Sequence, residues 1–209
     1  MKRGLKTMRR PAIDSHRLRA FSLLELLIVV AILALVTTLY WGGKPASRQQ
    51  QKQAACARNL EKIFIAMQIY ATDHAAKFPE VAGARTSEQV FDLLVPQYSV
   101  DTSLFICPGS KDPPLPAGEP LLKSKVSYAC YMGRRAKDTQ GVLMSDKQID
   151  TKSKAAGQTA FSTTGQPPGN NHDQYGGNFL FGDGDVERSP ASVPFSIMLT
   201  QGIVLLNPK

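Results

Sequence analysis

The chain has 209 residues, 43% of them hydrophobic, and a formal net charge of +8 at pH 7. Residues 1–20 hold seven lysines and arginines against one aspartate, so this segment has a charge of +6 and the rest of the chain only +2. No basic stripe with interleaved aromatic residues follows it. The basic isoelectric point therefore belongs to the N-terminal segment and does not indicate nucleic-acid binding.

Residues 21–41 form an apolar run whose only charged side chain is Glu25. A helix of this length spans about 31 Å, at about 1.5 Å per residue, which matches the hydrocarbon core of a bilayer. The run is longer than the core of a secretory signal and ends without a small-residue cleavage site. The positive-inside rule keeps the basic segment 1–20 in the cytoplasm and exports residues 42–209. We therefore expect a single-pass inner-membrane protein with a periplasmic domain.

The acid in this run is unusual, because a carboxylate inside a transmembrane helix costs roughly 2.5–3.5 kcal/mol. A plain signal anchor explains the length of the run but not the sequence FSLLE at the charge boundary. That sequence resembles the type IV pilin and pseudopilin signal. The resemblance implies that prepilin peptidase cleaves between Ala20 and Phe21, that Phe21 is then N-methylated, and that Glu25 pairs with the terminal amine of a neighbouring subunit. The family usually has glycine where this chain has Ala20.

The exported residues 42–209 are enough for one domain. Gly42, Gly43 and Pro45 are expected to interrupt the helix outside the membrane. A second helix is expected at about 47–74, because apolar residues recur there at helical spacing. The stripe, which we expect to face the core, contains Cys56, Leu60, Ile63, Met67 and Tyr70.

The remaining chain predicts a short helix at 86–94 followed by short strands. This order indicates an α+β, pilin-like fold with the long N-terminal helix packed on a small antiparallel sheet. The segments 108–120 and 147–170 are polar and are expected to be mobile or to contact partners. The expected strands lie at 104–107, 126–132, 141–145, 178–181 and 193–199.

A wider resemblance covers most of the chain. The strings CARNLEKIFIAMQIYATDHAAKFP, LFICPGS, SYACY and NHDQYGGNFLFGDGDVE are similar to those of a group of bacterial pilin-like proteins abundant in planctomycetes. Members of this group end in a motif of His, nine residues and Asp-Gly. Here His172, Asp183 and Gly184 fill the motif, with ten residues in between. The resemblance implies a role in a type II secretion or pilus-like assembly, with other pilin or pseudopilin subunits as partners.

The same motif contains the best candidate for a metal site. If 179–187 is strand-like, Asp183, Asp185 and Glu187 lie on one face and, with Asn178 or Asp173, offer oxygen ligands for Ca²⁺. Some pseudopilins bind calcium in their C-terminal region, which the resemblance extends to this chain. The alternative is a solvated hairpin turn, which Gly-Asp-Gly favours. His172 either joins Asp183 at a transition metal or makes a structural hydrogen bond that fixes the loop.

Three cysteines in an oxidising compartment predict one disulfide and one free thiol. Spacing alone does not fix the pairing. The resemblance favours a bridge between Cys56 and Cys107, because the group tends to pair a cysteine of the long helix with one in a Cys-Pro motif. Cys107 with Cys130 is the alternative pairing.

No enzymatic activity is expected, because the sequence has no G-x-S-x-G, H-E-x-x-H, Walker or C-x-x-C motif. The main interpretation is a pseudopilin or minor pilin-like subunit that prepilin peptidase processes and that assembles through residues 21–41. The first alternative is a monomeric, membrane-anchored periplasmic domain that binds a cation or glycan near Asp183. The second is a metal-dependent hydrolase centred on His172 and Asp183.

Overall fold

The structure, a computed structural model, describes residues 22–41, 45–116, 119–166 and 168–209. The chain divides into two compact units, residues 1–43 and 44–209. The leader 1–20, the expected cleavage site Ala20–Phe21 and the expected interruption at Gly42 and Gly43 lie outside the described residues.

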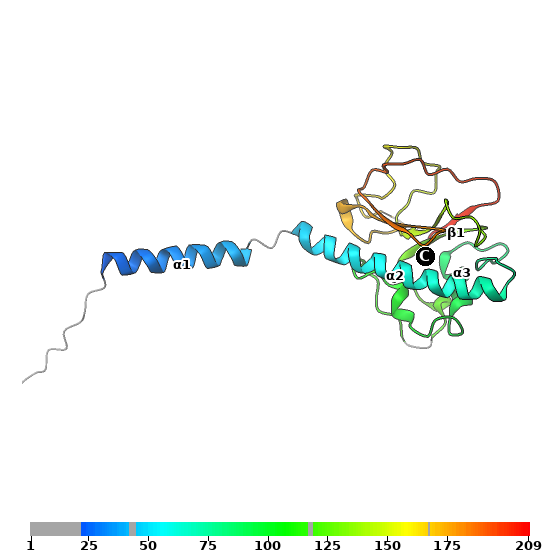
Figure 1. Ribbon diagram of the computed structural model, residues 1–209, viewed down its shortest axis with the longest axis horizontal. Coiled ribbons are helices and arrows are strands. Elements are labelled where there is room, and N and C mark those ends of the chain that lie inside the picture. The colour runs from blue at the N-terminus through cyan, green and yellow to red at the C-terminus, as the bar shows by residue number, and fades with distance from the viewer. Residues whose placement is uncertain (1–21, 42–44, 117–118, 167) are drawn as a thin grey trace, which may run out of the picture. The chain divides into compact units, whose positions relative to one another are not determined.

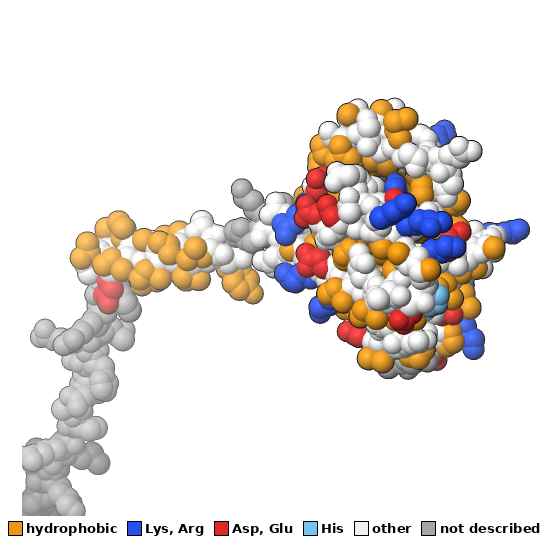
Figure 2. All heavy atoms as spheres, turned by 45° about the vertical axis from the view of Figure 1, so that its right-hand side comes forward, with side chains coloured by type: hydrophobic (Ala, Val, Ile, Leu, Met, Phe, Trp, Pro, Cys, Tyr) orange, Lys and Arg blue, Asp and Glu red, His pale blue; other side chains and the backbone are white. Residues whose placement is uncertain are grey.

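The described part of the first unit is helix α1, Leu23–Trp41. Apolar side chains surround this helix on all sides, which is typical of a helix in lipid. Figure 2 shows that hydrophobic atoms cover α1, whereas charged and polar side chains are spread over the second unit. Residues 23–40 are long and apolar enough to cross a membrane, and none of them is buried within the protein.

The second unit begins with helix α2, Pro45–Asp73, which corresponds to the helix expected at 47–74. Pro45 is suited to a helix start, because the first helical residue has no intrahelical partner for its amide. One face of α2 is buried, and Leu60, Ile63 and Met67 on it are fully inaccessible to solvent. The opposite face carries charged side chains, so the apolar stripe faces the core as predicted.

A five-stranded antiparallel sheet lies against α2, with the strand order β4-β3-β2-β1-β5. This arrangement confirms the α+β, pilin-like class (Figure 1). Each neighbouring pair of strands is antiparallel. The strands are β1 Tyr128–Met132, β2 Val142–Asp146, β3 Gly177–Phe181, β4 Val186–Ser189 and β5 Val204–Leu206.

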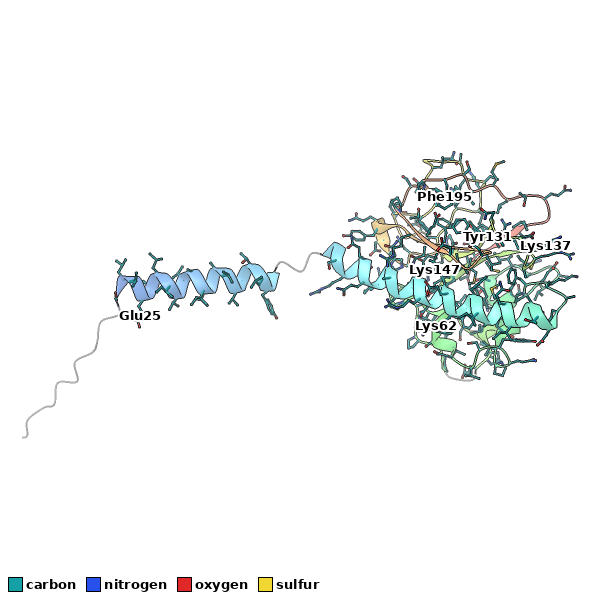
Figure 3. The ribbon with its side chains drawn as sticks, viewed as in Figure 1. Glu25, Lys62, Tyr131, Lys137, Lys147 and Phe195 are labelled. Atoms are coloured by element: carbon teal, nitrogen blue, oxygen red, sulfur yellow. A yellow bond between two sulfur atoms is a disulfide. The ribbon has the colours of Figure 1, made fainter. Side chains whose placement is uncertain are left out.

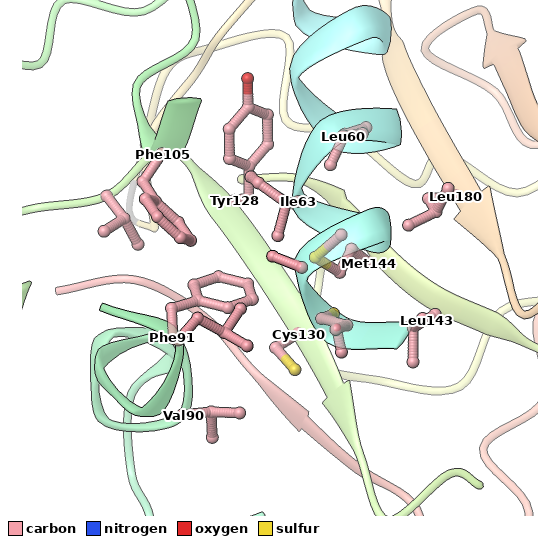
Figure 4. Close-up of a cluster of buried hydrophobic side chains, with 14 of the residues drawn as sticks. Leu60, Ile63, Val90, Phe91, Phe105, Tyr128, Cys130, Leu143, Met144 and Leu180 are labelled. Atoms are coloured by element: carbon pink, nitrogen blue, oxygen red, sulfur yellow. The ribbon is translucent and has the colours of Figure 1, made fainter. Parts of the chain in front are cut away.

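The main core lies between the sheet and α2. Because side chains alternate across a strand, Tyr128 and Cys130 of β1 face this core, and Leu180 of β3 does too. In Figure 4 they surround Leu60 and Ile63 of α2. Helix α3, Ser87–Phe91, closes the same core through the buried Val90 and Phe91, and a 3-10 turn, Asp92–Leu94, extends the short helix predicted at 86–94.

The other face of the sheet is covered by irregular chain. The segment 147–170 was expected to be polar and either mobile or in contact with partners, but its Ile149, Ala160 and Phe161 are buried in a second core. There they pack with Phe179 of β3 and with Val193 from the connection between β4 and β5. Isolated bridges such as Ile149–Phe161 hold this layer together. The few apolar residues of this layer have no regular spacing, so the sequence did not predict that the layer is buried.

Two predicted strands are wrong. Residues 104–107 lie in and after a 3-10 helix, Thr102–Phe105, whose N-cap Asp101 accepts a hydrogen bond from the Ser103 amide at 3.0 Å. This cap satisfies a free amide at the helix start and so competes with an extended conformation. Residues 193–199 form no strand in the described structure, and the sheet instead uses β4 and β5.

Candidate functional site

Glu25 lies in the first turn of α1, and its helix begins with a hydrogen bond from the Leu26 amide to the Ser22 carbonyl. Figure 3 shows its side chain at the end of α1 that follows the leader. A negative charge at a helix N-terminus is stabilised by the helix dipole. All of α1 from residue 22 to residue 40 is exposed, so the carboxylate and the apolar surface beside it are free to contact lipid or another molecule.

The Asp-Gly end of the predicted motif is the turn of a hairpin between β3 and β4. Gly184 has φ +94°, a left-handed conformation that favours glycine. The Asp185 amide donates a hydrogen bond to Oδ1 of Asp183 at 3.0 Å, and the Phe181 amide donates to the Asp185 carbonyl. These contacts are those of a turn stabilised by its own aspartate.

The predicted calcium ligands do not come together. Among the described residues, the one group of at least three His, Cys, Asp or Glu side chains with clustered ligand atoms excludes Asp183, Asp185 and Glu187. Asn178 is completely buried and directed to other partners. His172 and Asp183 lie beyond opposite ends of β3, so the hairpin is the better description of the Asp-Gly end.

The His end of the motif lies in a buried polar cluster. His172 is inaccessible to solvent, and its Nε2 atom is 3.3 Å from Sγ of Cys107 and 3.5 Å from Oδ2 of Asp146. Its Nδ1 atom has no hydrogen-bond partner among the described residues. Gly109 packs against the ring so closely that a Cβ there would lie 2.5 Å from Nδ1.

Asp146, the last residue of β2, is the centre of this cluster. Its Oδ1 accepts a hydrogen bond from Nδ2 of Asn171 at 2.6 Å, and its Oδ2 accepts from the amide and from Nδ2 of Asn178, both at 2.8 Å. A buried carboxylate is normally stabilised by donors of this kind. The burial of Tyr128 and, to a smaller extent, the negative charge of the neighbouring Asp146 raise the pKa of Tyr128 well above its usual value.

The cluster also ties the helix to the sheet. Asn178 donates from Nδ2 to the Gln53 carbonyl of α2 at 3.1 Å, and Gln53 donates from Nε2 to the Gly177 carbonyl of β3 at 2.7 Å. This reciprocal pair is buried, so each group would be costly to leave unpaired. The polar residues next to His172 therefore position α2 on the sheet.

The structure contains the disulfide between Cys56 and Cys107, which is the pairing that the family resemblance predicted. It joins α2 to the segment before β1 across 51 residues of sequence, and the two Cα atoms are 5.1 Å apart. The alternative pairing with Cys130 is wrong. Cys130 is a buried free thiol in the main core, and burial raises its pKa to about 12.

Sequence reasoning missed Asp146, Gln53 and Asn171 as site residues. Gln53 and Asp146 belong to no motif, and Asn171 directly precedes His172 but is not one of the residues that define the motif. The three come together only through sheet pairing and helix packing. The one available signal was Asp146 at the end of a largely apolar strand, where a buried acid requires partners.

The comparisons with known proteins concern the first unit. The model of the prokaryotic N-terminal methylation motif matches residues 16–40, a stretch that includes Ala20, Phe21 and Glu25. No curated protein and no solved structure matches the chain. The chain thus carries a type IV pilin-like signal of the kind that prepilin peptidase processes, and its apolar helix fits a membrane-anchored protein. The resemblance to the planctomycete group stays a prediction.

Proposed function

We propose that the chain is a pseudopilin or minor pilin-like subunit of a type II secretion or type IV pilus-like system. The observation that carries this proposal is the methylation motif at residues 16–40, which runs into an exposed apolar helix with Glu25 in its first turn. In this proposal residues 21–41 first anchor the chain in the inner membrane. They then form the contacts between subunits, while the second unit lies on the periplasmic side.

Processing and assembly are linked by charge. Cleavage after Ala20 would remove a segment of charge +6 and create a free amine on Phe21. Such a charge holds the cytoplasmic end of a membrane helix in place. The new amine of one subunit and Glu25 of its neighbour are then opposite charges in an apolar environment, where pairing offsets the cost of burying each. The cost of burying Glu25 is therefore offset in the assembled form.

The proposed role is structural. The buried cluster around His172 lies in the interior, where Gly109 packs against the Nδ1 side of the ring. The exposed hairpin carries acids that are engaged in its own turn. We therefore propose that the chain acts by assembling and presenting its second unit, and not by catalysis.

The test is Glu25→Gln, which removes the charge and keeps the size of the side chain. It is expected to leave processing and membrane insertion intact and to abolish the incorporation of the subunit into filaments, measured by cross-linking in membranes and by its presence in sheared filament fractions. Ser22→Ala is the matched control, because it alters the same helix turn without a charge. Unchanged incorporation of Glu25→Gln would contradict the proposal and favour a monomeric anchored domain.

A further inference from the structure

The buried cluster brings together two sulfur atoms, an imidazole and a carboxylate. The candidate ligand atoms of Cys56, Cys107, Asp146 and His172 all lie within 4.8 Å of one another, and all four residues are buried. In the oxidised chain the two sulfurs are bonded to each other and are not metal ligands. In the reduced chain, the same four residues form the set of thiolate, imidazole and carboxylate ligands that Zn²⁺ prefers.

We propose that the chain with Cys56 and Cys107 reduced binds one Zn²⁺ through these two thiolates, Nε2 of His172 and a carboxylate oxygen of Asp146. The disulfide and the zinc site would then be alternative states of one cluster. The zinc-bound state belongs to the newly made chain, whose cysteines are still thiols, or to a chain reduced by a dithiol.

The distances to the histidine nitrogen support this geometry. With bond lengths of about 2.3 Å to sulfur and about 2.0–2.1 Å to nitrogen and oxygen, a tetrahedral site places a sulfur about 3.5 Å from a nitrogen and a nitrogen about 3.4 Å from an oxygen. In the structure Nε2 of His172 is 3.3 Å from Sγ of Cys107 and 3.5 Å from Oδ2 of Asp146. The imidazole and the carboxylate thus already have the spacing of zinc ligands. The two sulfurs must separate to about 3.8 Å.

The carboxylate of Asp146 has outer hydrogen bonds of the kind that orient a metal ligand. Asn171 and Asn178 donate to Asp146 and fix the orientation of its carboxylate. Outer partners of this kind orient the ligands of a metal and raise its affinity. The ring of His172 is held by Gly109 with Nε2 directed at Cys107 and Asp146, so the nitrogen that would bind zinc faces the other ligands.

The redox step balances simply. A dithiol reductant supplies two electrons and two protons, breaks the bond between Cys56 and Cys107, and becomes a disulfide itself. Zinc binding then releases the two thiol protons to water, because thiolates are the ligands. In the oxidised chain only His172 and Asp146 remain as ligands, which is too few for a structural zinc site.

The test uses the detergent-solubilised full-length chain, prepared oxidised and prepared reduced with a phosphine, and titrated with Zn²⁺ and with Co²⁺ as a spectroscopic probe. We expect the reduced chain to bind one equivalent of either metal, with a cobalt spectrum of tetrahedral coordination and a charge-transfer band from two thiolates. The oxidised chain should bind at least about 100-fold more weakly, since loss of an outer partner alone costs 10–100-fold.

Two variants locate the site. Asn178→Ala keeps all four ligands and should lower the zinc affinity of the reduced chain by about 10–100-fold. Cys130→Ala removes the cysteine outside the cluster and should leave the affinity and the cobalt spectrum unchanged. The cobalt spectrum of the unmodified chain is decisive even if Asn178→Ala does not fold. A reduced chain that shows no two-thiolate tetrahedral spectrum, or that binds zinc no more tightly than the oxidised chain, would overturn the proposal.

Discussion

Replacing Asp146 by alanine should destabilise the second unit by about 3 kcal/mol. Without the carboxylate, Nδ2 of Asn171 keeps the Ser127 carbonyl at 2.7 Å, and Nδ2 of Asn178 keeps the Gln53 carbonyl at 3.1 Å. The backbone amide of Asn178, in contrast, loses its acceptor. An orphaned buried donor costs about 1–3 kcal/mol, and the lost charge-assisted hydrogen bonds and the space left by the carboxylate add to this.

The assay is thermal unfolding of the detergent-solubilised, disulfide-intact chain. For a unit of this size, about 3 kcal/mol lowers Tm by roughly 6–12 °C. The matched control is Glu187→Ala on β4, whose side chain is exposed. Exposed substitutions of this kind change the stability by about 0.5 kcal/mol or less, so this variant should lose less than about 2 °C. Equal Tm values for the two variants would refute the view that Asp146 organises the core.

Three further predictions concern the core and the hairpin. Burial raises the pKa of Cys130 to about 12 and the pKa of Tyr131 above its usual range, so the folded chain retains protons that the unfolded chain loses. Tm should therefore fall as the pH rises above 9, and a flat profile up to pH 11 would be contrary evidence. Iodoacetamide should modify Cys130 only after denaturation, and its modification in the native chain at pH 8 would contradict its burial. Gly184→Ala adds a Cβ at φ +94°, 2.6 Å from the Phe64 ring, and should cost about 1–3 kcal/mol in denaturant titrations. Gly165→Ala, at φ +72° with no atom within 4 Å of the new Cβ, should cost less, and a reversed order would be inconsistent with the structure.

The elements with strong local patterns were predictable from the sequence. The membrane helix, α2 and the central strands β1, β2 and β3 each follow from a run or a spacing of apolar residues. The irregular layer on the face of the sheet opposite α2 was not predictable. Phe161 and Val193 become core residues only when the sheet provides a surface for them. The strand β5 has only three residues, and it is a strand because it pairs with β1.

The candidate site was predictable in part. The motif singled out His172, and the resemblance predicted the pairing of Cys56 with Cys107. Neither predicted that His172 contacts Cys107. The local signal at Asp146 was weak, since a carboxylate at a strand end is commonly solvated. The acids at 183–187 were the opposite case. Their alternation predicted a shared face, whereas the Gly-Asp-Gly turn bends the chain before such a face can form.

The most direct test of the account is the N-terminus of the protein extracted from membranes, determined by intact mass and peptide sequencing. We predict a chain that starts at N-methylated Phe21, with the basic leader removed. A chain that retains Met1 would leave a plain membrane anchor, and one that starts beyond Tyr40 would be a released domain. Either of these results would contradict assembly through residues 21–41.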